Sequence, residues 1–80
     1  MEVGQIVCSL GGSDKGSFLL VVDLDKDYVY LADGKRFKLN RPKRKNPKHI
    51  SATKTKLKEE EFLTDKAVRK ALAVYQNKLL

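Results

Sequence analysis

Residues that commonly build disulfides, metal centres and redox sites are scarce in this 80-residue chain. It has one cysteine, Cys8, one histidine, His49, and no tryptophan. A single cysteine cannot form a disulfide within the chain and is typical of a reducing compartment. One cysteine and one histidine also fall short of the four ligands of a structural zinc site. We therefore expect a cytoplasmic protein that holds no metal and no cofactor.

Long apolar runs are also absent. No window approaches the roughly 18 apolar residues that indicate a membrane-spanning helix. Residues 1–4 lack the basic start and the apolar run of a secretory signal. Hydrophobic residues make up 41% of the chain, which is enough for one small core but not for two. The sequence thus predicts a single domain without a membrane partner.

No plausible catalytic set is present. His49 lies within a basic stretch, and Cys8 falls in a predicted strand, where a thiol behaves as a small apolar side chain. The glycine-rich loop at residues 11–16 is not followed by the Gly-Lys-Ser/Thr of a phosphate-binding loop. The alternating acids at residues 23–27 lack the ligand spacing of a calcium loop and are interpreted as a polar turn. We expect neither an enzyme nor a small-molecule substrate.

Charge is distributed along the chain in three blocks. Residues 1–34 carry six acidic and two basic side chains, residues 35–58 carry eleven basic and no acidic ones, and residues 59–80 carry four of each sign. The net charge of +7 therefore comes from one segment. Because like charges this close together repel one another and weaken a compact state, the segment indicates a polyanionic partner rather than a role in stability.

Short strands separated by turn residues fill the first half of the chain. Apolar, aromatic and β-branched residues predict strands at residues 3–9, 18–24, 28–32 and 35–39. The dipeptide Asp33-Gly34 is a strong hairpin signal between the last two of them. Two prolines predict an irregular loop at residues 40–46. A short fifth strand at residues 48–52 would close a barrel.

The hydrophobic period changes near the C-terminus. The stripe of an amphipathic helix is formed by Val68, Ala71, Leu72, Tyr75 and Leu79. Thr64 or Asp65 is the expected N-cap, and the acidic residues 59–61 precede this helix or form a short one of their own. The stripe packs either on the barrel or on another protein. Packing on the barrel is favoured, because an isolated helix of about 15 residues is marginal in water.

The order of these elements predicts the fold class. Four or five short strands followed by one helix favour a mainly β fold, a small closed or nearly closed barrel with a C-terminal α-helix. Residues 1–53 are expected to form the barrel, with a basic loop at residues 40–49. Residues 54–80 are expected to form a linker and the amphipathic helix.

The basic segment supplies most of the candidate binding residues. Arg36 and Lys38 alternate along a predicted strand and therefore share a face, and further cations follow on the proline-stiffened loop. Arginine binds phosphate through paired hydrogen bonds, whereas lysine acts as a point charge. His49, Tyr28 and Tyr30 either stack on RNA bases or fill the fold. The segment's candidates are Lys35, Arg36, Lys38, Arg41, Lys43, Arg44, Lys45, Lys48 and His49.

Two groups of residues resemble a known family. The pattern G-x-I-V at residues 4–7, the loop G-x-D-K-G at residues 12–16 and the apolar run at residues 18–22 resemble the KOW motif of ribosomal and transcription proteins with SH3-like barrels. The stretches VYLADG at residues 29–34 and PKRKNPKH at residues 42–49 are similar to bacterial KOW-domain RNA-binding proteins. That group is related to eukaryotic and archaeal large-subunit ribosomal proteins. The similarity spans residues 2–53 and extends loosely to the C-terminal helix.

The resemblance implies an SH3-like barrel that binds ribosomal RNA at the large subunit, as a ribosomal or ribosome-associated component. Ribosomal proteins are further candidate partners, through the C-terminal helix. Asp14 and Lys15 match the family's loop and residues 43–49 its basic block, which adds Lys15 to the RNA-binding candidates. Ser13 departs from the family pattern, which often has arginine there, so we expect more of the contact at the basic block.

Two other functions stay open at this point. SH3-like barrels also bind peptides, and the acidic first third of the chain could attract a basic protein. The basic block would also suit duplex DNA, as in a transcription-associated KOW protein. Comparing structured RNA with duplex DNA at equal salt separates the two nucleic-acid hypotheses.

Overall fold

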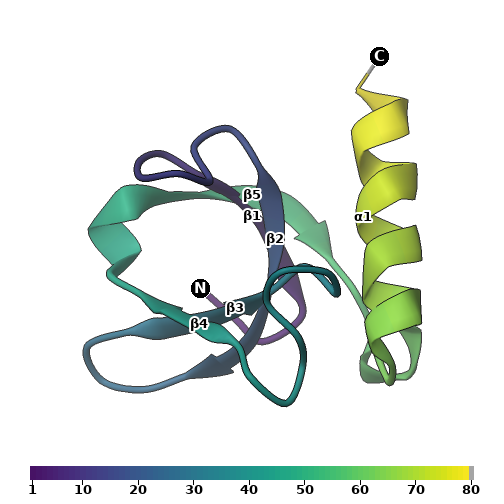
Figure 1. The fold of residues 1–80 in the computed structure, drawn as a ribbon, viewed down its shortest axis with the longest axis horizontal. Helices are drawn as coiled ribbons and strands as arrows, with labels where there is room; N and C mark the ends of the chain where they lie inside the picture. Colours follow the sequence, from purple (N-terminus) through teal and green to yellow (C-terminus); the bar gives the residue numbers. More distant parts are fainter. Residues whose placement is uncertain (80) are drawn as a thin grey trace.

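The computed structural model describes residues 1–79 and contains one antiparallel sheet and one α-helix (Figure 1). The strands are β1 (Gln5–Ser9), β2 (Phe18–Leu24), β3 (Val29–Ala32), β4 (Lys43–Lys45) and β5 (Ile50–Lys56). Two short 3-10 helices, η1 (Pro47–His49) and η2 (Glu59–Glu61), precede and follow β5. The α-helix is α1 (Asp65–Lys78). The strand order in the sheet is β4-β3-β2-β1-β5. The predicted fold class, mainly β with one C-terminal helix, is confirmed.

The sheet is apolar on both faces, which explains the nearly continuous apolar sequence of β2. Successive side chains of a strand point to opposite faces. Leu19 of β2 and Val7 of β1 lie in the inner core of the curved sheet, whereas Leu20 and Ile6 face α1. Cys8, expected in the core, belongs to neither cluster and is partly exposed. The sheet therefore forms a middle layer between an inner core and the helix (Figure 1).

The helix α1 packs on the sheet, which decides between the two packing alternatives that the sequence left open. Thr64 is the N-cap, and its hydroxyl accepts a hydrogen bond of 3.1 Å from the backbone N–H of Ala67. Val68 and Leu72 are buried against the sheet. Tyr75 meets Phe18 of β2 edge to face, with 5.2 Å between ring centroids. Burial of this stripe stabilises a helix that would be marginal alone.

The prediction of a strand at residues 35–39 is wrong, because these residues belong to a turn. The carboxylate of Asp33 accepts hydrogen bonds from the backbone N–H groups of Lys35 and Phe37, at 2.9 and 3.0 Å. Such side-chain bonds offer the backbone an alternative to strand pairing. Because the segment is not extended, Phe37 packs against the inner core and Leu39 against the cluster under α1, instead of sharing one face.

The irregular loop predicted at residues 40–46 is partly wrong, because it contains β4. This strand pairs antiparallel with β3, and Arg44 lies opposite Tyr30. Pro42 and Pro47 flank the three residues of β4 and do not interrupt them. The strand therefore keeps all of its backbone N–H groups.

The fifth predicted strand exists but is longer and begins later than expected. Residues 47–49 form η1, and β5 then runs to Lys56, so the boundary predicted at residue 53 falls inside this strand. It pairs with β1, with Ala52 opposite Val7. The architecture is consistent with a small SH3-like domain, and β4 and β5 are the two outer strands of the sheet within residues 1–79. No helix in this part of the chain has the length and apolar character needed to cross a bilayer.

Candidate nucleic-acid interface

A buried ion pair joins β4 to the glycine-rich loop at residues 10–16. The ammonium of Lys45 lies 2.9 Å from Asp14 Oδ1, and it donates hydrogen bonds to Ser9 Oγ at 2.6 Å and to the carbonyl of Gly11 at 3.0 Å. The Lys45 side chain is 9% exposed and that of Asp14 is 2% exposed. The expected position of Lys45 on an exposed loop is therefore wrong, because Lys45 lies in β4 and its side chain is buried. In β4 the side chains alternate, so Arg44 points outward and Lys45 inward.

The same contacts fix the conformation of the loop. Burial alone would raise the pKa of Asp14, but hydrogen bonds from Lys45 and Ser9 and the charge of Lys45 lower it to about 2. The Lys43 ammonium lies 3.6 Å from the second carboxylate oxygen. Gly16 closes the loop with φ +85°, a conformation that glycine adopts without strain. Lys15 is exposed on this fixed loop.

We predict that acid weakens the fold through Asp14. The folded pKa is about 2 and the ordinary value is 3.8, so the stabilisation is complete above about pH 4 and is lost as the pH falls toward 2. The shift corresponds to about 2 kcal/mol. Urea unfolding of wild type and Asp14→Asn between pH 2 and 5 measures it. The difference in the free energy of unfolding between the two proteins should shrink as the pH falls. A difference that does not change with pH would contradict the lowered pKa of Asp14.

The turn at residues 33–41 is held between the sheet and α1. The carboxylate of Asp65 accepts a hydrogen bond of 2.8 Å from the backbone N–H of Leu39. The guanidinium of Arg69 donates one of 2.6 Å to the carbonyl of Gly34. Both partners come from the first two turns of α1. The basic side chains of the turn are thus carried on a backbone that is tied at both ends.

Cations gather around Phe37 on this turn. Two of them lie over its half-buried ring, the Arg36 guanidinium at 5.2 Å and the Lys43 ammonium at 4.9 Å from the centroid. Arg36 also donates a hydrogen bond of 3.3 Å to Ser13 Oγ. The departure from the KOW pattern at Ser13 therefore does not leave the glycine-rich loop without a neighbouring cation.

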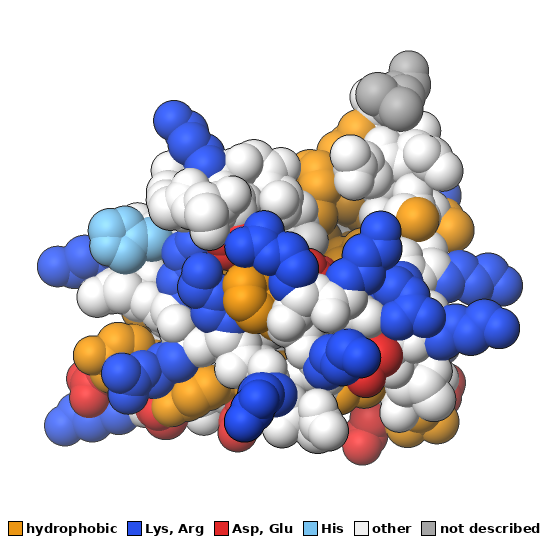
Figure 2. All heavy atoms as spheres, in the orientation of Figure 1, with side chains coloured by type: hydrophobic (Ala, Val, Ile, Leu, Met, Phe, Trp, Pro, Cys, Tyr) orange, Lys and Arg blue, Asp and Glu red, His pale blue; other side chains and the backbone are white. Residues whose placement is uncertain are grey.

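The exposed cations Arg36, Lys38 and Arg41 line one hollow beside Asn40. Their proximity follows from the tight turn, since the backbone of Lys38 bridges to that of Arg41. Figure 2 shows Lys and Arg side chains spread over this face, with acidic groups mostly along one margin. We define the basic face as the cations of the turn, of the adjoining glycine-rich loop and of the start of β4: Lys15, Lys35, Arg36, Lys38, Arg41 and Lys43.

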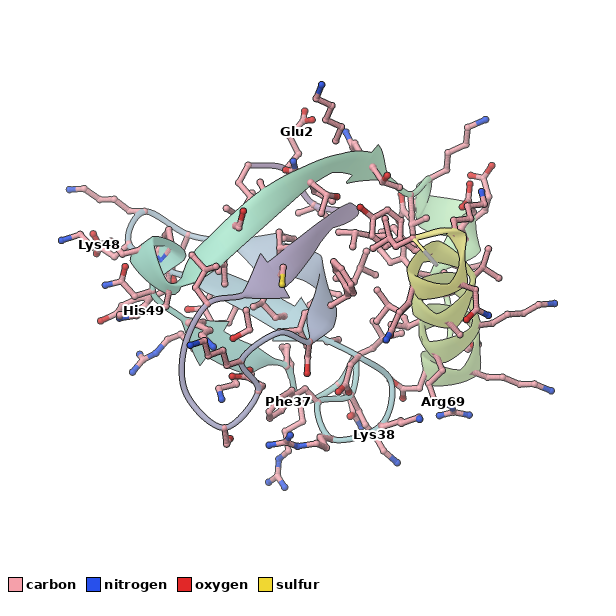
Figure 3. All side chains as sticks on the ribbon, turned by 90° about the horizontal axis from the view of Figure 1, so that it is seen from above. Glu2, Phe37, Lys38, Lys48, His49 and Arg69 are labelled. Carbon is pink, nitrogen blue, oxygen red and sulfur yellow. The ribbon has the colours of Figure 1, made fainter. Side chains whose placement is uncertain are left out.

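The remaining exposed candidates are Arg44, Lys48 and His49. Figure 3 shows Lys48 and His49 on η1 at one end of the molecule, away from Phe37 and Lys38. Arg44 lies over the ring of Tyr28, with 4.5 Å between the guanidinium carbon and the centroid. The structure thus divides the sequence-predicted set into a basic face, a second exposed group on β4 and η1, and the buried Lys45.

Tyr30 takes part in the turn between β2 and β3. Its hydroxyl donates a hydrogen bond of 2.5 Å to Asp25, whose carboxylate also accepts from the backbone of Asp27 and Tyr28. The hydrogen bond from Tyr30, with those from the turn backbone, lowers the pKa of Asp25, and the same bond raises the pKa of Tyr30. The carboxylate of Asp25 therefore organises the polar turn.

Sequence reasoning missed Arg69. The C-terminal segment is neutral overall, so a charge count by segment gives no signal there. The spacing of Asp65 and Arg69 places both on one side of the helix, one turn apart, and this is the only sequence hint. Figure 3 shows Arg69 on the same side of the molecule as Phe37 and Lys38.

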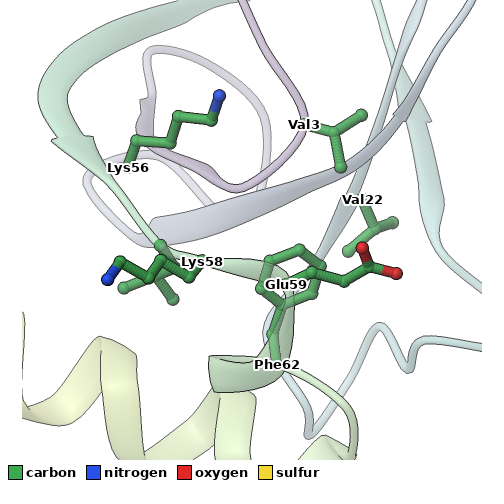
Figure 4. Close-up of a pocket in the computed structure, with 7 residues that line it drawn as sticks. Val3, Val22, Lys56, Lys58, Glu59 and Phe62 are labelled. Carbon is green, nitrogen blue, oxygen red and sulfur yellow. The ribbon is translucent and has the colours of Figure 1, made fainter.

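Another hollow, where β5 meets η2, has mixed character (Figure 4). Its lining residues are Val3, Val22, Lys56, Leu57, Lys58, Glu59 and Phe62. Charged groups of both signs stand around an apolar floor, in contrast to the uniformly basic hollow beside Asn40. The basic face is therefore the stronger candidate for a polyanion.

Comparison of the chain with models of protein families gives no match, and no curated protein matches it either. The resemblance to KOW proteins thus rests on the residues that carry it. The function of the basic face has to follow from its own geometry and charge.

Proposed function

We propose that the protein is a non-enzymatic, cytoplasmic RNA-binding protein that binds ribosomal RNA at the large subunit, as a ribosomal or ribosome-associated component. One observation supports this most: an exposed cation of the turn, Arg36, and a partly exposed one of β4, Lys43, lie over the half-buried ring of Phe37 on a backbone that is tied to α1. The KOW-like sequence pattern points to the same class of partner.

The mechanism is electrostatic docking on a preformed surface. Cations of the basic face neutralise phosphates and release the counterions condensed on RNA, which drives association and makes it sensitive to salt. Because Asp33 and Asp65 already order the turn, little conformational entropy is lost on binding. The buried Lys45 contributes by fixing the glycine-rich loop rather than by touching RNA.

Aromatic rings beside cations favour RNA over duplex DNA. Phe37 and Tyr28 each carry at least one cation over the ring and are partly exposed. Such groups stack on unpaired bases, which folded RNA presents in loops and bulges and which a regular DNA duplex does not. Duplex DNA is the principal alternative, and the competition experiment below distinguishes it.

We predict that the triple substitution Arg36→Ala, Lys38→Ala and Arg41→Ala weakens binding to ribosomal RNA about 100-fold at about 150 mM salt. Three lost phosphate contacts also reduce the slope of log K against log salt by about 3. Fluorescence anisotropy over a salt series measures both quantities. The control replaces Lys26, Lys70 and Lys78 with alanine, which removes the same charge from exposed positions outside the basic face. Equal losses of RNA affinity in the two triple variants would contradict a specific role of the basic face, because net charge alone would then explain the binding.

The ribosomal assignment is tested by co-sedimentation with purified subunits at physiological salt. We expect migration with the large subunit that free ribosomal RNA competes away and duplex DNA at equal phosphate concentration does not. Migration with neither subunit would contradict the ribosomal role. Equal competition by DNA would favour the DNA-binding alternative.

A further inference from the structure

A hollow lies where α1, the turn at residues 33–35 and the start of β2 meet. Its polar wall contains two cations, Lys35 and Arg69, one acid, Asp33, and two neutral hydrogen-bonding groups, Ser17 and Gln76. The Asp33 carboxylate already accepts two backbone hydrogen bonds from the turn. The hollow therefore combines a net positive charge with uncharged donors.

Arg69 is held in place in this wall. Its Nη1 donates to the carbonyl of Gly34 at 2.6 Å, and its aliphatic part lies against the same glycine, since a Cβ built there would be 2.7 Å from Arg69 Cγ. This is the one side-chain hydrogen bond that Arg69 makes among residues 1–79. A guanidinium has five N–H donors. An oriented guanidinium with donors to spare is suited to paired hydrogen bonds with a phosphate.

The hollow continues the basic face. Lys35 belongs to both, and in Figure 3 Arg69 lies on the same side as Phe37 and Lys38. Figure 2 shows basic side chains continuing from the sheet onto the helix. Asp65 and Arg69 bind the turn to α1 through hydrogen bonds. The hollow and the basic face therefore keep a fixed relative position, and binding a common partner needs no rearrangement.

We propose that this hollow is a phosphate subsite, in which Lys35 and Arg69 bind a backbone phosphate as the RNA passes from the basic face onto α1. The inference rests on the proposed function and adds to it a contact on the helix. It also gives the helix a role in RNA binding besides covering the sheet.

The test compares Arg69→Gln and Lys35→Ala with the control Lys70→Gln. Lys70 is the next residue of α1 and lines a different, mainly apolar hollow between the helix and β5. At about 150 mM salt we expect each subsite variant to bind ribosomal RNA roughly threefold to tenfold more weakly, with a salt slope lower by about 1. Lys70→Gln should stay within about twofold of wild type in the same anisotropy assay.

The outcomes separate the subsite from the proposed function. If wild type shows no salt-dependent RNA binding, the proposed function fails. If the triple variant of the basic face loses affinity while Arg69→Gln and Lys35→Ala bind as wild type, the subsite is overturned and the proposed function stands. Should Arg69→Gln lower the melting temperature through the lost bond to Gly34, the double variant decides. Lys35→Ala should then cost less affinity in the Arg69→Gln background than in wild type, because the two cations share one phosphate, and an unchanged cost would overturn the subsite.

Discussion

Replacing Lys45 with methionine is expected to lower the free energy of unfolding by about 3–5 kcal/mol, as when one partner of a buried ion pair is removed. The change leaves the Asp14 carboxylate buried without its closest cation and removes one of the two side-chain donors to the Gly11 carbonyl. Small domains are stable by only about 5–15 kcal/mol, so the loss is a large fraction of the total. Urea unfolding at neutral pH measures it.

The matched control is Arg44→Ala, one residue earlier in β4. Its side chain is exposed, so we expect a change within about 0.5 kcal/mol. The double variant Lys45→Met with Asp14→Asn should recover part of the loss, because no carboxylate charge is then left buried. Equal effects of Lys45→Met and Arg44→Ala would contradict the buried ion pair.

The second large effect is expected for Gly34→Ala, which should lower the free energy of unfolding by about 2 kcal/mol or more. This residue has φ +81°, which an L side chain rarely adopts. The added Cβ would overlap the backbone carbonyl oxygen of Asp65 and the Cγ of Arg69. Since a backbone carbonyl cannot rotate away as a side chain can, α1 has to shift off the turn. Thermal unfolding followed by circular dichroism measures the loss.

Gly16→Ala provides the comparison. Gly16 has nearly the same backbone conformation, φ +85°, but no heavy atom lies within 4 Å of a Cβ built there. We expect Gly16→Ala to lower the free energy of unfolding by about 1 kcal/mol, from backbone strain alone. Equal losses at the two glycines would show that α1 does not press on the turn.

Elements with a clear hydrophobic period could be predicted from the sequence. The β-branched and aromatic residues of β2, bounded by turn signals, gave its bounds correctly. The stripe at residues 68, 72 and 75 gave the helix and its buried face, and Thr64 was one of the two expected N-caps. The turn at residues 33–39 could not be predicted, because it depends on which backbone groups the Asp33 carboxylate binds. Residues 35–39 alternate as a strand would, and a local hydrogen bond overrides that pattern.

The candidate site was predictable in composition but not in arrangement. Eleven cations in residues 35–58 mark the basic segment. Nothing in a run of three basic residues tells which one is buried, because this depends on the register of β4 against β3 and on Asp14, about 30 residues away. Arg69 was missed for a related reason, since it joins the face only through the tertiary contact with Gly34.

The pairing of β1 with β5 has a kinetic consequence. Val7 lies opposite Ala52, 45 positions along the chain, and contacts between such distant segments form slowly because the loop must close first. In a chain synthesised from its N-terminus, the basic residues up to position 49 emerge before β5 is complete. Until then β1 has no partner on one edge, and α1, whose bonds brace the turn, does not yet exist. A nascent chain therefore presents a flexible polycation, and only the finished chain offers cations at fixed spacing.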